Sequence, residues 1–147
     1  MSLYLALLTY NIENEEKERL ISYLKLPKTI AQTLRDAAEI KSKMLQLADI
    51  RLKPSAVYRL LKGYSMQSLT AGIISGDSTA ARQNIKLYVN KMRMVKPMLT
   101  GEDLIKMGIP QGPRIKEVLG KLLEARLDGE VKTRRDEERL VENWVKD

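Results

Sequence analysis

The chain has 147 residues, of which 44% are hydrophobic and 31% charged, a balance typical of a folded helical protein rather than a disordered one. It contains no Cys and no His, which excludes disulfides and thiolate metal sites and removes the commonest transition-metal ligand. Lys and Arg outnumber Asp and Glu by 26 to 19, for a net charge of +7. Because no apolar run approaches about 18 residues and no signal peptide is visible, we expect a cytoplasmic protein without a membrane span.

Apolar periodicity and Gly/Pro punctuation predict helices throughout, and therefore an all-α fold. In chain order, the body is expected to contain helices at residues 3–10, 13–24, 27–48, 54–63, 65–74 and 77–95. The third of these is long and buries Leu34 and Leu45 on one face. The sixth is capped by Asp77 or Ser78 and ends before Pro97. The predicted organisation is a helical body over residues 1–97 and a tail over residues 98–147.

Three further helices are expected in the tail, with a Gly/Pro hairpin between the first two. Thr100 is a good N-cap for the first tail helix, and Gly108 ends it. Gly112 followed by Pro113 begins the second helix, since proline suits the first helical position. Thr133 opens the third. The acidic run at residues 136–138 falls in the first turn of this helix, where acids are electrostatically favoured, so we assign no metal ligand.

The hairpin also has features of an anion site. The N-terminus of a helix presents unpaired N–H groups and about half a positive charge. Gly112 has no side chain to block the approach of an anion, and Arg114 and Lys116 follow it. The alternative is that the glycines and prolines only make a tight turn between two helices, a common arrangement.

Positive charge is concentrated in the middle of the chain. Residues 28–99 hold 13 Lys and Arg against 4 Asp and Glu, an excess of 9, whereas residues 100–147 hold 10 against 11. An excess of this size usually indicates a phosphate-rich partner, although solubility alone accounts for a modest net charge.

Two basic surfaces are expected in this region. At about 100° per residue, four side chains of the sixth helix fall within about 80° of one another: Arg82, Lys86, Arg93 and Lys96. They are predicted to neutralise nucleic-acid phosphates, with a merely solvated cationic face as the alternative. The second surface consists of Lys53, Arg59 and Lys62, beside Tyr58 and Tyr64. A tyrosine can stack on an unpaired base. The helical spacing of Tyr58 predicts that it lies in the core, whereas the role of Tyr64 is left open.

Two stretches of the chain carry a more specific resemblance. The tail, LTGEDLIKMGIPQGP followed by a long helix ending LLEARLDGEVKTRRDEERLVE, resembles the C-terminal tail of bacterial tRNA nucleotidyltransferases. These are the CCA-adding or A-adding enzymes of the poly(A) polymerase superfamily. Residues 52–64, LKPSAVYRLLKGY, resemble a segment in the helical region upstream of that tail. The resemblance covers roughly residues 3–145.

The resemblance implies a function that is divided between this chain and another part of the enzyme. In that family an N-terminal head carries catalysis, with a Gly-Ser motif for triphosphate and an Asp-x-Asp pair for metal ions. This chain has neither motif. We therefore expect no catalytic residue, metal or cofactor here, while the parent enzyme would use Mg²⁺ with ATP or CTP. The expected function is that of a non-catalytic C-terminal fragment that binds tRNA, or another structured RNA, and positions it for CCA or A addition by the head.

The alternative is a self-standing helical nucleic-acid-binding or interaction module of helix–hairpin–helix type. The usual hairpin of that type has two glycines two residues apart, whereas Gly108 and Gly112 are four apart. The sequence leaves open whether the parent enzyme adds CCA, CC, A alone or a poly(A) tail, and it does not define the oligomeric state.

Overall fold

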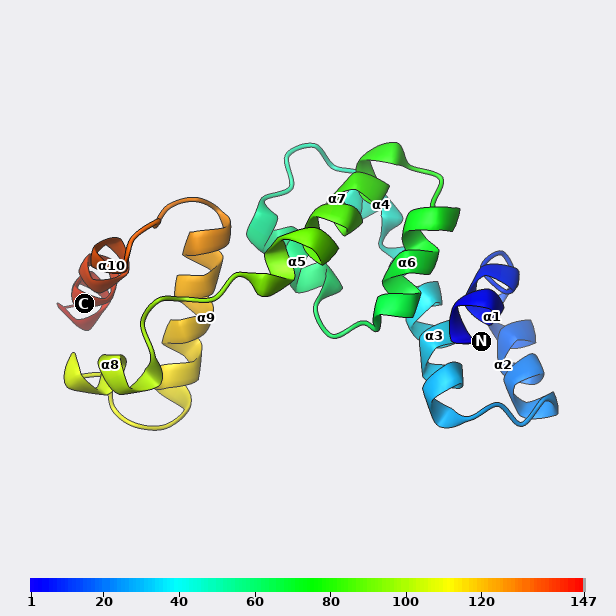
Figure 1. Ribbon diagram of the computed structural model, residues 1–147, viewed down its shortest axis with the longest axis horizontal. Coiled ribbons are helices and arrows are strands. Elements are labelled where there is room, and N and C mark those ends of the chain that lie inside the picture. The colour runs from blue at the N-terminus through cyan, green and yellow to red at the C-terminus, as the bar shows by residue number, and fades with distance from the viewer. Residues whose placement is uncertain (147) are drawn as a thin grey trace. The chain divides into compact units, whose positions relative to one another are not determined.

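The computed structural model describes residues 1–146, and these form helices and connecting turns without a β-strand (Figure 1). The predicted all-α fold class is confirmed. The chain divides into two compact units: the first comprises Met1–Leu52 and Ala56–Arg93, and the second comprises Lys53–Ser55 together with the chain from Met94 onward. None of the described helices is long and apolar enough to cross a bilayer.

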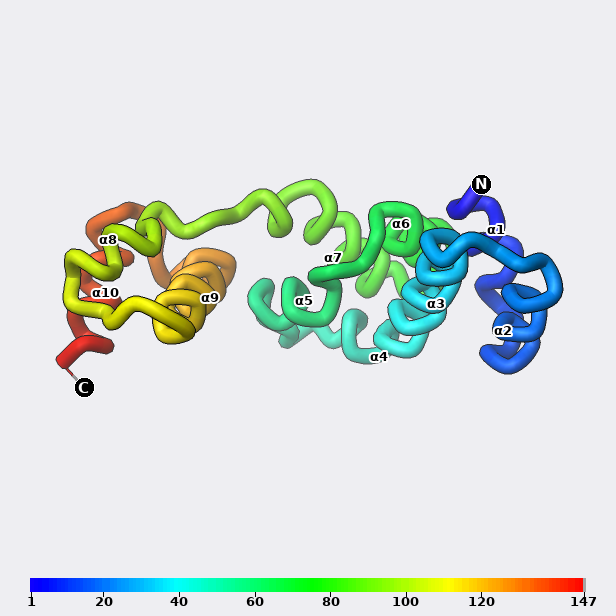
Figure 2. The backbone as a smooth tube through the Cα atoms, turned by 90° about the horizontal axis from the view of Figure 1, so that it is seen from below, coloured from blue at the N-terminus to red at the C-terminus, as the bar shows by residue number. Residues whose placement is uncertain are grey.

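The first unit contains most of the helices. They are α1 (Ser2–Leu8), α2 (Asn14–Tyr23), α3 (Lys28–Ser42), α4 (Met44–Leu47), most of α5 (Pro54–Leu61), α6 (Met66–Ser75), α7 (Thr79–Asn90) and a 3₁₀ turn, η1 (Met92–Met94). Helices α1, α3 and α6 pack around Ala6, Ala37 and Ala71, whose small side chains allow close helix approach (Figure 2). This three-helix contact forms the centre of the unit.

The predicted long third helix is wrong, because the structure divides it at Lys43. There φ is −93° and ψ is 0°, and the backbone N–H is shared between the carbonyls of Glu39 and Ile40. The change in backbone direction rotates the following helix face. Leu47 is therefore fully buried, whereas Leu45, which we expected in the core, is 89% exposed.

The predicted sixth helix is also too long. Helix α7 ends at Asn90, because Lys91 leaves the helical region at φ −132° and ψ −58°. This break lets Met92 turn inward, where it is 4% exposed. No Gly or Pro marks the break in the sequence, so packing of Met92 rather than local propensity determines where the helix stops.

The second unit is built on α8 (Gly101–Lys106), α9 (Pro113–Leu127) and α10 (Arg134–Lys146), which confirms the predicted three-helix tail. Its core is formed by side chains from all three helices and the segments around them: Leu99, Leu104, Ile109, Val118, Leu122 and Val141. Thr100 caps α8 as predicted, in a reciprocal capping box with Asp103. Hydrogen bonds from the Thr100 backbone and ion pairing with Arg134 lower the pKa of Asp103 to about 2.

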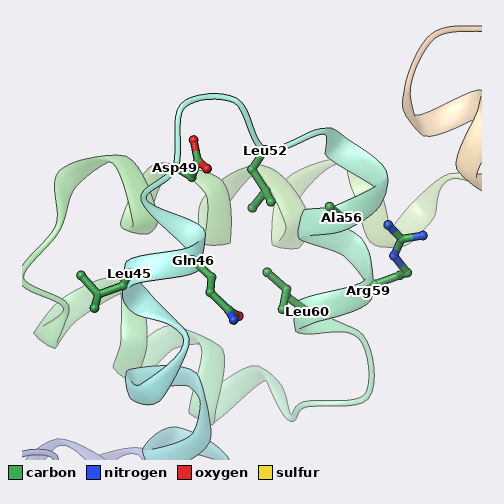
Figure 3. A pocket seen from close by; sticks show the side chains of 7 residues that line it. All are labelled: Leu45, Gln46, Asp49, Leu52, Ala56, Arg59 and Leu60. Atoms are coloured by element: carbon green, nitrogen blue, oxygen red, sulfur yellow. The ribbon is translucent and has the colours of Figure 1, made fainter.

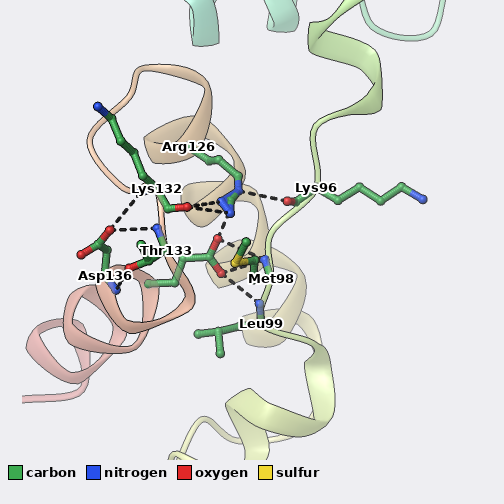
Figure 4. A network of polar contacts seen from close by, with 8 residues as sticks. Lys96, Met98, Leu99, Arg126, Lys132, Thr133 and Asp136 are labelled. Atoms are coloured by element: carbon green, nitrogen blue, oxygen red, sulfur yellow. Dashed lines mark hydrogen bonds and ion pairs between the residues drawn. The ribbon is translucent and has the colours of Figure 1, made fainter.

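A buried carboxylate holds the segment that precedes α8 (Figure 4). Glu137, on α10, is fully buried and accepts hydrogen bonds from the backbone N–H of Met98 at 2.9 Å and of Leu99 at 2.9 Å. The Arg126 guanidinium lies 3.4 Å from this carboxylate and also donates to the Lys96 carbonyl at 3.2 Å. Glu137 and Arg126 therefore tie α9 and α10 to the chain at residues 96–99.

A second carboxylate in this unit joins residues that are far apart in the sequence. Asp128, at the end of α9, accepts hydrogen bonds from the Ser55 backbone N–H at 2.8 Å and from the Ser55 hydroxyl at 2.7 Å. Ser55 lies in the first turn of α5, where backbone N–H groups have no helical acceptor. The Asp128 carboxylate thus supplies the acceptor that the start of α5 lacks.

Candidate nucleic-acid interface

The basic side chains of α7 are only partly free to meet a ligand. Arg82 and Lys86 lie one turn apart and so share a helix face. Lys86 is exposed, but the Nε of Arg82 donates to the Ile73 carbonyl at 2.6 Å, which leaves only the terminal nitrogens of its guanidinium for another acceptor. Arg82 therefore helps to hold the end of α6 in addition to any contact it makes with RNA.

The predicted four-residue basic stripe does not exist as one helix face, because α7 ends before two of its members. Arg93 lies in η1 and is exposed. Lys96 belongs to the second unit, where its backbone carbonyl accepts from Arg126 while its exposed side chain points away from that network (Figure 4). That these residues bind RNA stays a prediction.

Helix α5 brings further positive charge beside α7. The rings of Tyr58 and Tyr88 lie 5.7 Å apart and pack the two helices together. This contact accounts for the half-buried position of Tyr58, which we predicted to be a core residue. Arg59, on α5, and Lys62, which follows α5, are exposed in the first unit. Lys53, the third member of the predicted second surface, is exposed and belongs to the second unit.

Tyr64, whose role the sequence left open, lies in a polar cluster of the first unit. Its hydroxyl donates to Glu39 at 2.7 Å and accepts from the Lys43 ammonium at 2.6 Å. The same ammonium lies 4.7 Å from the centre of the ring. Burial, and then the Glu39 carboxylate, raise the pKa of Tyr64 far above its ordinary value. The hydroxyl is thus bonded to two protein groups, which favours a structural role for Tyr64.

The hairpin of the second unit leads into a helix start that no side chain caps. Gly112 is the N-cap of α9 at φ 128° and ψ −151°, no side chain caps the helix, and Pro113 occupies its first position. Arg114 and Lys116 are exposed, but Arg114 lies 3.3 Å from the Glu117 carboxylate. Part of the positive charge at this helix start is therefore balanced within α9.

The first unit also has a hollow between α4 and α5 that the sequence analysis did not identify (Figure 3). Its volume is about 590 Å³, and its lining is mainly apolar: Leu45, Gln46, Asp49, Leu52, Ala56, Arg59 and Leu60. The amino-acid sequence contains only a weak indication of this hollow. Leu45 and Ile50 are apolar residues, and in the structure both are almost fully exposed.

Three acidic residues of the first unit take part in separate local hydrogen bonds. Asp36 accepts from Gln32, Glu39 accepts from Tyr64, and Asp49 accepts from the Arg51 backbone, so these carboxylates serve separate local bonds. Within residues 1–146, no group of three or more His, Cys, Asp or Glu side chains is placed to hold a metal ion.

Comparison with known proteins identifies the family that this chain matches. The family model described as tRNA nucleotidyltransferase domain 2, putative, matches residues 2–143. An A-adding tRNA nucleotidyltransferase from Geobacter sulfurreducens is 39% identical over 90 residues, which are 61% of this chain and 10% of that protein. The matched part thus spans about a tenth of the relative's length. No solved structure matches the chain. The chain belongs to the tRNA nucleotidyltransferase domain 2 family, as the resemblance of its tail and of residues 52–64 predicted.

Proposed function

We propose that this chain is the tRNA-binding, non-catalytic part of a longer tRNA nucleotidyltransferase. In this proposal it holds the tRNA while a catalytic head elsewhere in the enzyme adds nucleotides to the 3′ end. The observation that carries the proposal is the family match over residues 2–143 of a chain in which residues 28–99 hold an excess of nine positive charges. The relative's name, an A-adding tRNA nucleotidyltransferase, gives tRNA as the RNA to test first.

The proposed binding mechanism is neutralisation of the RNA backbone. Lys and Arg side chains replace the counterions around phosphates, and the released ions favour association. Such contacts fix the orientation of an RNA without reading its sequence. Lys62, Lys86 and Arg93 are exposed in the first unit and suit this role. Arg82 contributes less, since one of its donors is already used.

The chain's contribution to the reaction would be positioning. Phosphoryl transfer depends largely on holding the attacking hydroxyl and the nucleotide in line, and oriented reactants react far faster than free ones. In this proposal the Mg²⁺ ions and the nucleotide belong to the head. The chain supplies a rigid helical surface that keeps the 3′ end of the tRNA within reach of it.

The test is the salt dependence of tRNA binding. We expect the affinity of the chain for a tRNA transcript to fall steeply between about 50 and 200 mM salt, with a slope of about 0.7 to 0.9 log units per phosphate contact. Lys86→Ala and Arg93→Ala should each weaken binding to different tRNAs about equally and reduce the slope by roughly one contact. Fluorescence anisotropy with labelled tRNA measures both quantities.

Lys28→Ala is the matched control, because Lys28 is exposed at the start of α3, outside the α5 and α7 surface. Its removal should leave the slope unchanged. Lys116→Ala reports separately on the hairpin and should reduce the slope only where α9 also touches RNA. Equal effects of Lys28→Ala and Arg93→Ala would reveal a diffuse positive field, and the proposed docking face would then be wrong.

A further inference from the structure

The hollow between α4 and α5 has a volume of about 590 Å³, and the RNA-backbone contacts proposed above leave it unused. We propose that it receives one unstacked base, an adenine, of the bound RNA. This inference rests on the proposed function, because it requires the chain to bind RNA. It adds a site that recognises a base to a surface that otherwise contacts only phosphates.

The size and apolar lining of the hollow allow it to pack against a planar base. Leu52, Ala56 and Leu60 give it aliphatic walls, and its volume of about 590 Å³ exceeds what one base needs. Figure 3 shows Leu52 pointing down from the rim and Leu60 pointing in from α5, toward the space that α4 borders. A base that leaves its stack loses contact with its neighbours, and apolar walls restore part of that contact away from water.

Gln46 gives the hollow a group that can recognise the base edge. It extends from α4 toward the space between the helices, and its side-chain amide has no hydrogen-bond partner within the described part of the chain (Figure 3). A glutamine amide offers one donor and one acceptor side by side, which match the amino group and the adjacent ring nitrogen of adenine. Asp49 offers a less available acceptor, since its carboxylate already binds the Arg51 backbone at 2.9 Å.

The charge around the hollow favours RNA over an apolar protein segment. Residues 50–62 contain four Lys and Arg and no Asp or Glu. The Arg51 side chain is 87% exposed, with its Nε 3.4 Å from the Asp49 carboxylate, and Lys62 is exposed just after α5. Arg59 lines the hollow with its stem while its guanidinium points away from it (Figure 3). Sites for single-stranded nucleic acids likewise combine cationic side chains with surfaces on which bases pack, and here the packing surface is aliphatic instead of the usual aromatic one.

The experiment compares three RNA probes: a fluorescein-labelled adenosine 12-mer, a uridine 12-mer of the same length, and the duplex of the two. We expect the adenosine 12-mer to bind most tightly and the duplex, whose bases are paired, to bind without using the hollow. Gln46→Ala should weaken binding of the adenosine 12-mer about tenfold, the discrimination expected of one bidentate amide–base contact. Ala56→Phe should produce a similar loss by filling the hollow.

Gln67→Ala is the matched control, since Gln67 is an exposed glutamine on α6 that does not line the hollow. The Gln67→Ala variant should bind each of the three RNA probes with the affinity of the wild-type chain. Gln46 is itself exposed, so Gln46→Ala remains decisive if Ala56→Phe fails to fold by circular dichroism. Equal binding of the adenosine and uridine 12-mers, with neither variant changing them, would overturn the base site.

The same measurements separate this inference from the proposed function. If tRNA binding still falls with salt and with Lys86→Ala while Gln46→Ala has no effect on any RNA, the tRNA module stands and the base site does not. If no RNA binds the wild-type chain, both fail. A change in self-association of the Ala56→Phe variant without a change in RNA affinity would assign the hollow to a protein surface, which also overturns the proposal.

Discussion

The residue with the greatest effect on stability is expected to be Glu137. Its carboxylate is fully buried, accepts from two backbone N–H groups and lies 3.4 Å from the Arg126 guanidinium. Glu137→Ala would leave all of these donors without their acceptor. We expect a loss of about 3 to 5 kcal/mol in the free energy of unfolding, the usual cost of removing one partner of a buried charged pair. Urea denaturation followed by circular dichroism measures it.

The neighbouring acid provides the comparison. Glu138 is half-buried and pairs with Arg134, an exposed side chain, so Glu138→Ala should cost no more than about 1 kcal/mol. Similar losses in Glu137→Ala and Glu138→Ala would contradict the structural role assigned to the buried carboxylate.

The contrast between these acids shows what residue patterns can and cannot reveal. We expected all three acids at 136–138 to serve the start of α10, and Asp136 does so by accepting from the Thr133 backbone at 2.9 Å. Glu137 lies four residues before Val141 and therefore on the buried face of the helix, which the spacing alone could have indicated. Its partners could not be predicted, because they come from residues 98, 99 and 126, distant in the sequence.

At the scale of the element, the two glycines of α9 should respond oppositely to the same change. Gly112 has φ 128° and ψ −151°, a conformation open essentially to glycine alone, so Gly112→Ala should cost about 1 to 3 kcal/mol of stability through backbone strain. Gly120 is exposed within the helix, and a Cβ there would meet nothing within 4 Å. Gly120→Ala should therefore stabilise the protein by up to about 1 kcal/mol.

Thermal melting of the two variants beside the wild type tests this pair. A stabilising Gly112→Ala would mean that the turn before α9 is not held in the conformation described. A destabilising Gly120→Ala would mean that this face of α9 packs against something the structure does not include.

Sequence patterns predicted the start of a helix correctly where a capping residue or a proline lies in its first turn. Pro54, Thr100 and Pro113 each lie at or next to the observed start of a helix, because caps and prolines act on their own turn. The patterns failed at Lys43 and Lys91, where no such residue stands and where burial of Leu47 and Met92 governs the backbone. The hollow between α4 and α5 was missed for the same reason, since it depends on the turn at Lys43.

The candidate interface was predictable in its composition more than in its geometry. The excess of positive charge in residues 28–99 identified the cationic region, and Lys86 and Arg93 are indeed exposed. The bond from Arg82 to the Ile73 carbonyl could not be predicted. It exists because the last carbonyls of a helix lack helical partners, and the fold brings Arg82 to this one.

For the whole molecule, we expect no nucleotide transfer by the isolated chain. With Mg²⁺ and labelled CTP or ATP in excess, it should add nothing to a tRNA that lacks its 3′ end, because its acids serve separate local bonds instead of a shared metal site. Gel electrophoresis of the labelled tRNA measures incorporation. Turnover by highly purified chain would contradict the proposed division between head and RNA-binding part.

The bond between Asp128 and Ser55 makes the second unit discontinuous in the chain. Its core helices come from the last third of the sequence, but it also includes residues 53–55. A gene fragment that encodes only residues 98–147 would thus omit the serine that Asp128 binds and the Lys96 carbonyl that Arg126 binds. Recombination or cloning that transfers only the C-terminal segment would therefore leave out residues that belong to the second unit. The shortest continuous fragment that contains the whole unit begins at or before Lys53.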